Sequence, residues 1–171
     1  MEPRAIPPPT GRSYWVIEGL LAAGAYPAGD ALERLIGAGI SAFVNLTQDT
    51  DWYSVDANLE RYDPLPADDT VVVRHPIVDL GVPTETAMSG ILDEIDRFLA
   101  EGRKVYVHCW GGIGRTGIVV GCWLIRHDLA HPADVLDILA RLRVADTGAG
   151  RHPSPETVEQ RAFVRSWRAE L

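Results

Sequence analysis

Apolar runs of two kinds recur along the chain, and their order predicts strands and helices in succession. Short runs rich in β-branched and aromatic residues predict buried strands at 14–17, 20–26, 40–46, 71–75 and 105–108. Amphipathic stretches predict helices at 30–38, 83–100, 115–128, 132–144 and 155–167. Ser154 and Pro155 are expected at the N-cap and the first position of the last helix. Because strands alternate with helices, the pattern predicts an α/β fold with a central, mostly parallel sheet flanked by helices.

The length and the composition predict one domain behind a short arm. The chain has 171 residues, 46% of them hydrophobic, which is enough for one well-packed core. Residues 1–13 are rich in proline and are expected to form a flexible arm, which leaves 14–171 as the folded domain. The polar stretch 47–69 is too long for a simple connection, and its role is left open.

Charge and cysteine content narrow the range of partners and cofactors. The net charge of −8 argues against nucleic acid or an anionic membrane as a partner. The longest apolar window, 117–125, is about half of the roughly 20 residues that cross a bilayer. Cys109 and Cys122 form no CxxC pair, and the histidines show no metal-ligand spacing. We therefore expect a cytoplasmic protein without a metal or another cofactor.

One short stretch, HCWGGIGRTG at 108–117, carries the strongest chemical signal. It follows a predicted strand and opens a predicted helix, and ligands in α/β folds bind at such strand ends. Its glycines let successive backbone N–H groups point inward, and the helix adds the positive end of its dipole, so the loop predicts a phosphate site. It lacks the lysine and the hydroxyl of the nucleotide P-loop. Cys109, beside Arg115, is expected to be a thiolate at neutral pH and to attack the bound phosphate.

The same stretch matches HCxxGxxR[ST]G, the signature of the cysteine-dependent protein tyrosine phosphatase superfamily, and the short chain resembles its small, bacterial-type dual-specificity branch. The resemblance implies that Cys109 is a nucleophile that forms a phosphocysteine intermediate and that Arg115 clamps the phosphoryl oxygens. It also implies that the Thr116 hydroxyl stabilises the thiolate and that His108 orders the loop through hydrogen bonds to the backbone. The residues expected to surround the phosphate are Trp110, Gly111, Gly112, Ile113, Gly114 and Arg115.

The family also supplies a proton donor, usually an aspartate on a loop about thirty residues before the cysteine, and Asp79 occupies that place. A solvated or loop-capping aspartate is the structural alternative for Asp79, and Asp49 and Asp51 are the next candidates for the acid. Gln160 resembles a family glutamine that positions the hydrolytic water, although a glutamine on an exposed helix face is usually solvated. The resemblance thus implies a nucleophile, a clamp and an acid, with a glutamine as a further catalytic residue.

These residues predict a phosphomonoester phosphatase that acts on phosphotyrosine in proteins. Phosphoserine and phosphothreonine are left open because the packing of 47–69 sets the depth of the pocket. Since residues 110–114 carry no charged side chain, aryl monophosphates are favoured over inositol polyphosphates and phosphoinositides. The alternatives are a phosphatase of inositol phosphates, phosphoinositides or nucleotides, and a non-catalytic phosphopeptide-binding module. Cys122, among apolar residues of the next helix, is expected to be a buried structural thiol.

Overall fold

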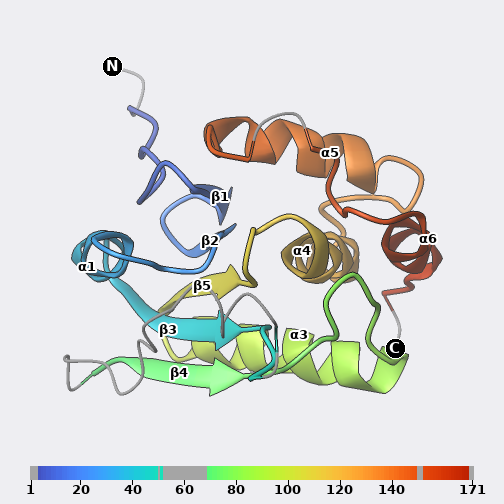
Figure 1. The fold of residues 1–171 in the computed structure, drawn as a ribbon, viewed down its shortest axis with the longest axis horizontal. Helices are drawn as coiled ribbons and strands as arrows, with labels where there is room; N and C mark the ends of the chain where they lie inside the picture. The colour runs from blue at the N-terminus through green and yellow to red at the C-terminus, as the bar shows by residue number, and fades with distance from the viewer. Residues whose placement is uncertain (1–3, 50, 52–68, 150–151, 170–171) are drawn as a thin grey trace.

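The computed structural model describes residues 4–49, 51, 69–149 and 152–169, and it contains one five-stranded sheet (Figure 1). The strands are β1 (Ser13–Ile17), β2 (Leu21–Gly24), β3 (Ile40–Asn45), β4 (Val71–Arg74) and β5 (Lys104–His108). Their order in the sheet is β1-β2-β5-β3-β4. β1 pairs with β2 in the antiparallel direction, and every other pair is parallel. The predicted α/β fold with a mostly parallel sheet is therefore confirmed.

Helices cover the sheet on two faces. They are α1 (Ala31–Gly37), α3 (Glu85–Ala100), α4 (Gly114–Arg126), α5 (Val135–Leu142), a 3₁₀ turn η1 (Arg143–Ala145) and α6 (Val158–Ser166). Val105 and Val107 of β5 point into the larger core, which they share with α3 and α4. Tyr106, between them, points to the other face and packs in a smaller core with Leu35 of α1. The two-residue alternation along β5 thus gives each face of the sheet its own core.

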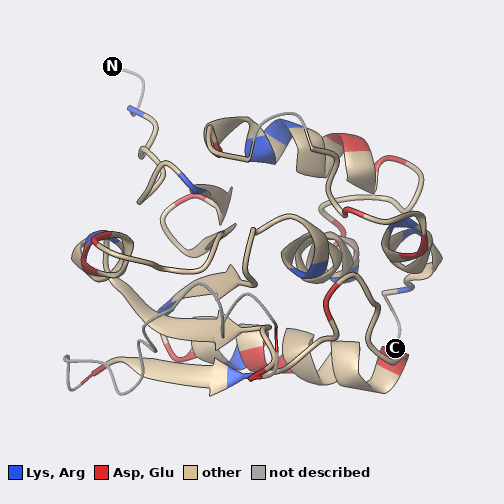
Figure 2. Cartoon of the chain, viewed as in Figure 1, with Lys and Arg blue, Asp and Glu red and all other residues tan. Residues whose placement is uncertain are grey.

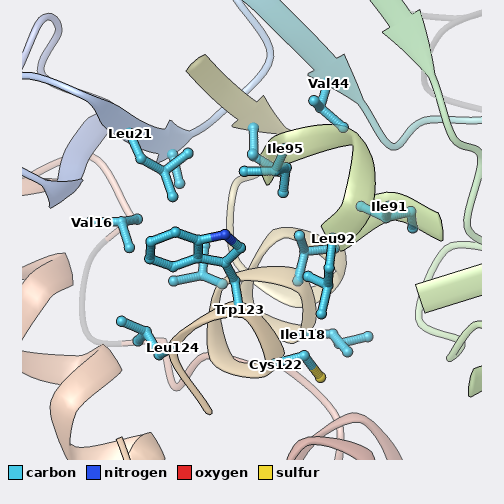
Figure 3. Close-up of a cluster of buried hydrophobic side chains, with 14 of the residues drawn as sticks. Val16, Leu21, Val44, Ile91, Leu92, Ile95, Ile118, Cys122, Trp123 and Leu124 are labelled. Atoms are coloured by element: carbon cyan, nitrogen blue, oxygen red, sulfur yellow. The ribbon is translucent and has the colours of Figure 1, made fainter. Parts of the chain in front are cut away.

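Helix α4 is enclosed by the rest of the fold. Its residues from Gly114 to Ile125 are all buried. Its charged residues are Arg115 and Arg126, whereas α3, α5 and α6 each carry charges of both signs (Figure 2). Figure 3 shows Trp123 and Cys122 of this helix among apolar side chains of the sheet and of α3. Burial raises the pKa of the Cys122 thiol well above its ordinary value. The prediction that Cys122 is buried is confirmed.

The start of the last helix differs from the prediction. Thr157 caps α6, with its side chain accepting the N–H of Gln160 while the Gln160 side chain accepts the N–H of Thr157. The expected start at Ser154 and Pro155 is therefore wrong, because this reciprocal capping box satisfies two N–H groups that would otherwise lack partners. Ser154 Oγ instead donates to Ile113 O at 2.6 Å. The other elements differ from their predicted ranges by only a few residues at their ends.

The segment that precedes β1 packs against the domain. Ser13, predicted as the last residue of the arm, begins β1. Its Oγ accepts from Thr10 N at 3.0 Å and donates to Thr10 O at 3.1 Å. Trp15 Nε1 donates to Pro7 O at 3.0 Å. These bonds tie the end of the segment to the sheet, and the flexible character of residues 1–13 as a whole stays a prediction.

Candidate active site

The carboxyl ends of four parallel strands meet at one edge of the sheet. The strand registers align Gly24, His108, Asn45 and Arg74, which end β2, β5, β3 and β4. The segments that follow these strands therefore start side by side although they are far apart in the sequence. Ligand sites of parallel sheets form at this edge, and Cys109 is the first residue after β5.

Cys109 is buried, and its sulfur faces a backbone N–H of its own loop. Gly112 N donates to Cys109 Sγ at 3.3 Å. Gly112 has a φ of +72°, and a Cβ at this position would collide with the carbonyl carbon of Gly24. Only glycine fits both this backbone conformation and this space. An inward-pointing N–H, which the glycine pattern predicts, is thus present beside the thiol.

His108, the last residue of β5, holds the loop backbone with its ring. Burial lowers the pKa of His108 to about 4, so the imidazole is neutral at physiological pH. Nδ1 lies 2.9 Å from Cys109 O, and because a carbonyl oxygen only accepts, Nδ1 carries the proton and donates it. The ring stacks on Tyr106, with 5.8 Å between the centroids. These contacts fix the backbone at Cys109, in line with the loop-ordering role that the resemblance implies.

Arg115 lies in the first turn of α4, and two carboxylates face its buried guanidinium. Nη1 donates to Asp51 Oδ2 at 2.8 Å and to Ile77 O at 3.1 Å, while Nη2 lies 3.3 Å from Asp79 Oδ1. The Asp51 side chain is 2% exposed, whereas that of Asp79 is 37% exposed. Asp79 is therefore the more accessible of the two, and Asp51 holds the guanidinium inside the protein.

The loop that carries Asp79 is tied to helix α6 by Gln160. Gln160 Nε2 donates to Gly81 O at 3.1 Å. Its Oε1 accepts the N–H groups of Glu156 and Thr157, at 3.0 and 3.1 Å. Gln160 is fully buried, so the alternative of a solvated glutamine on an exposed helix face is wrong. The structure brings this predicted residue to the Asp79 loop by way of Gly81.

Asp49 and Thr116 are two further predicted site residues. Asp49, a candidate for the acid, pairs with Arg74 Nη1 at 2.7 Å at the end of β4. The Thr116 hydroxyl is buried and has no hydrogen-bond partner among the described residues. Its contact with the Cys109 thiolate stays a prediction.

Trp110, inside the loop, packs on an aromatic side chain of the β2–α1 connection. Its ring lies 5.9 Å from that of Tyr26, and its carbonyl accepts the Tyr26 N–H at 2.9 Å. Both residues line a pocket of about 450 Å³ that also includes Arg12 and Arg34. The assignment of Trp110 to phosphate binding stays a prediction.

The sequence did not predict the contacts that two residues, Asp51 and Arg12, make at this edge. Asp51 was expected only as a substitute acid, but it is a buried partner of Arg115. Arg12, in the segment without assigned chemistry, donates from Nη2 to Gly111 O at 2.9 Å. No local motif marks either contact, because each joins segments that the sheet brings together from distant parts of the chain.

Neither a metal site nor a membrane span is found in the part of the chain that the structure describes. Its His, Cys, Asp and Glu side chains form no group of three or more suited to a metal ion. None of its helices is long and apolar enough to cross a bilayer. Of the polar stretch 47–69, residues 50 and 52–68 lie outside the described residues, so its effect on pocket depth stays a prediction.

Comparison with known families decides the membership of the chain. The family model described as "Polymorphic toxin system, DSP-PTPase phosphatase" matches residues 21–129, more than half of the chain. The chain belongs to this family. The resemblance of this DSP-PTPase family member to cysteine-dependent protein tyrosine phosphatases is thereby confirmed.

The chain is also similar to individual proteins in sequence and in structure. "Cyclin-dependent kinase inhibitor 3" of Sus scrofa is 33% identical over 98 residues, which cover 57% of this chain and 43% of the relative. The match thus spans less than half the length of that curated relative. A mutant form of Tk-PTP is 25% identical, with a TM-score of 0.72, over 90% of this chain and 92% of that one. PTPMT1 in complex with PI(5)P, at 18% identity and a TM-score of 0.70, covers 90% of this chain and 92% of its own and shows the fold alone.

Proposed function

We propose that the chain is a phosphomonoester phosphatase that hydrolyses phosphotyrosine in proteins through a phosphocysteine intermediate. The observation that carries the proposal is the placement of Cys109 and Arg115 around one glycine loop. The thiol sulfur accepts the Gly112 N–H, and the guanidinium lies 3.3 Å from the Asp79 carboxylate. A nucleophile, a cationic clamp and a carboxylic acid are the groups that phosphoryl transfer to a thiol requires. Membership of the DSP-PTPase family supports the same chemistry.

The first step transfers the phosphoryl group to the protein. The Cys109 thiolate attacks phosphorus and forms an S–P bond while the P–O ester bond breaks. Arg115 and the loop N–H groups hold the equatorial oxygens and stabilise their charge. Asp79 donates its proton to the leaving oxygen. The Thr116 hydroxyl is proposed to donate to the thiolate, and His108 keeps the loop backbone in place.

The second step releases phosphate. Water attacks the phosphocysteine, the S–P bond breaks, and Asp79 takes the proton of the water, which restores the acid and the thiolate. Gln160 acts in this proposal by holding the Asp79 loop rather than by aligning the water. Its Nε2 is engaged with Gly81 O, and its Oε1 accepts two backbone N–H groups.

The residues around the loop favour an aryl group over a polyanion. No charged side chain occurs between Cys109 and Arg115. Val78 and Leu80, on either side of Asp79, are 61% and 53% exposed. A phenyl ring gains free energy when it covers such apolar surface, whereas a further phosphate finds no cation within the loop. We therefore place phosphotyrosine before inositol phosphates, phosphoinositides and nucleotides.

A side-by-side kinetic comparison tests the substrate class. At fixed ionic strength, kcat/KM for a phosphotyrosine peptide is expected to exceed that for inositol polyphosphates and phosphoinositides by about tenfold or more. A preference for an inositol polyphosphate would overturn the substrate assignment and leave the cysteine chemistry standing. Binding of the phosphopeptide without hydrolysis of any ester would instead establish the non-catalytic module.

Replacement of Asp79 by asparagine tests the proton donor. Asp79→Asn should lower kcat/KM about 100-fold or more for esters with poor leaving groups, the usual size of general-acid catalysis. The fall in kcat/KM should be smaller for nitrophenyl esters, because their leaving oxygen needs little protonation. The decline of activity at high pH should flatten, while the acidic limb persists. If both limbs remain and good and poor leaving groups suffer alike, the donor is another carboxylate, with Asp49 or Asp51 next.

A companion variant separates the two roles considered for Gln160. Gln160→Glu keeps an acceptor for the capping N–H groups but cannot donate to Gly81 O. If Gln160 acts through the Asp79 loop, kcat/KM should fall for poor leaving groups and less for good ones, as in Asp79→Asn. If it aligns the water, kcat should fall while kcat/KM stays unchanged. The phosphocysteine should then accumulate, which is seen as an initial burst of the leaving group. Glu159→Gln, one residue earlier on α6, is the matched control.

A further inference from the structure

Arg12 reaches the loop after β5 from the segment that precedes β1. The β1–β2 pairing sets Ser13 opposite Gly24. Next to that pair, Arg12 O accepts the N–H of Ala25 at 3.0 Å. Because β2 also pairs with β5, the end of which aligns with Gly24, the Arg12 side chain lies within reach of the loop. Its Nη2 donates to Gly111 O at 2.9 Å.

The carbonyl that Arg12 contacts belongs to the same peptide unit as the N–H that faces the thiol. Gly111 O accepts from the guanidinium, and Gly112 N donates to Cys109 Sγ. In a planar trans peptide the C=O and the N–H point in opposite directions, so the guanidinium and the sulfur lie at the two ends of one dipole. A positive charge on the carbonyl side makes the N–H a stronger donor. The N–H end of this peptide dipole therefore points at the sulfur, and Arg12 lies at its carbonyl end.

Asp146 holds Arg12 in this position. Arg12 Nε donates to Asp146 Oδ1 at 3.0 Å, and the Asp146 side chain is fully buried. The same oxygen accepts the N–H groups of Gly148 and Ala149, each at 3.2 Å. A Cβ at Gly148 would collide with the Arg12 side chain. The Arg12 side chain is 43% exposed, but its Nε is held by a buried carboxylate and its aliphatic part packs closely on Gly148.

We infer that Arg12 is a positioning residue for Cys109: held by Asp146, it orients and polarises the 111–112 peptide and so stabilises the attacking thiolate. The inference rests on the proposed function, since it affects catalysis only if Cys109 is the nucleophile. It gives a specific role to a segment that precedes the predicted domain.

Other titratable groups lie near Cys109 or contact the residues that surround its loop. Tyr14 of β1 and Tyr106 of β5 interact electrostatically with Cys109, and the His108 ring contacts its carbonyl. Asp51 and Asp79 face Arg115, and Asp146 pairs with Arg12. Burial raises the pKa of both tyrosines and lowers that of His108 to about 4, so these three are neutral near pH 7. Replacement of Arg12 removes the ion-pair partner of one of these groups, the buried Asp146.

Alkylation of Cys109 by iodoacetamide across pH tests the inference, because it follows the thiolate fraction and does not require phosphatase activity. Arg12→Met should raise the midpoint of this titration by about one pH unit, with the acidic limb of kcat/KM moving alongside. Arg12→Lys keeps a charge and a donor, so its titration midpoint should lie between those of the wild type and Arg12→Met. Arg34→Met removes an arginine that lines the same pocket but pairs with Asp30 instead of the loop, and it should keep the wild-type midpoint. Mass spectrometry of the labelled peptide excludes Cys122.

An unshifted midpoint in folded Arg12→Met overturns the inference. An equal shift in Arg34→Met overturns it as well, because that result would show a general effect of lost charge. Thermal unfolding establishes that the variants are folded, and if Arg12→Met is not, Arg12→Gln removes the charge while keeping a polar side chain and carries the same test. If the wild-type protein hydrolyses no phosphate ester but the Arg12 shift is present, the proposed function fails and the inference on the thiol is supported.

Discussion

Replacement of Cys109 by serine is expected to abolish turnover of aryl phosphates, a loss of about four orders of magnitude or more. A serine hydroxyl is far less acidic than a thiol, so it is not ionised at neutral pH and does not attack phosphorus. The loop N–H groups and Arg115 remain, so binding of inorganic phosphate or a substrate should persist. Steady-state hydrolysis and calorimetric phosphate binding measure the two properties separately.

The second cysteine provides the matched control. Cys122 is buried in α4 among apolar residues, so Cys122→Ser should lower thermal stability and leave kcat/KM within a few-fold of wild type. Measurable steady-state hydrolysis by Cys109→Ser, or a comparable loss in folded Cys122→Ser, would contradict the assignment of the nucleophile.

Replacement of Arg115 by lysine is expected to lower kcat/KM by about 100- to 1000-fold, the range for loss of a donor to a developing oxyanion. The guanidinium is planar and offers two parallel N–H groups to phosphate oxygens, whereas an ammonium is a point charge. Arg115 also donates to Asp51 and to Ile77 O. A lysine has too few donors to keep these bonds and bind two phosphoryl oxygens as well.

The same helix contains a suitable control for this substitution. Arg126 is the last residue of α4, at the opposite end of the helix from the loop, and it pairs with Asp93 and Asp96 of α3. Arg126→Lys should therefore keep nearly wild-type kinetics. Activity of Arg115→Lys within a few-fold of wild type, with unchanged phosphate affinity, would count against the clamp.

Features that depend on neighbouring residues were predictable. The apolar run that forms β5, the glycines of the following loop and the apolar helix behind it are adjacent in the chain, so their pattern alone indicates a strand end, a glycine loop and a helix start. The placement of Cys109 and Arg115 at the two ends of that loop follows directly. The α6 capping box of Thr157 and Gln160 is also a local signal for a helix start. The prediction from Ser154 and Pro155 overlooked it.

The α/β fold, the glycine loop between a strand and a helix, and the likeness to cysteine-dependent phosphatases could be predicted from the sequence, because each rests on short-range pattern. The distant side chains that support the loop are known only from the folded structure. The hydrogen bonds from Arg12 to Gly111, from Arg115 to Asp51 and from Gln160 to Gly81 join residues 99, 64 and 79 positions apart. Such contacts depend on strand order and register and on how the helices pack, and these follow from burial of the whole core rather than from the residues beside each contact.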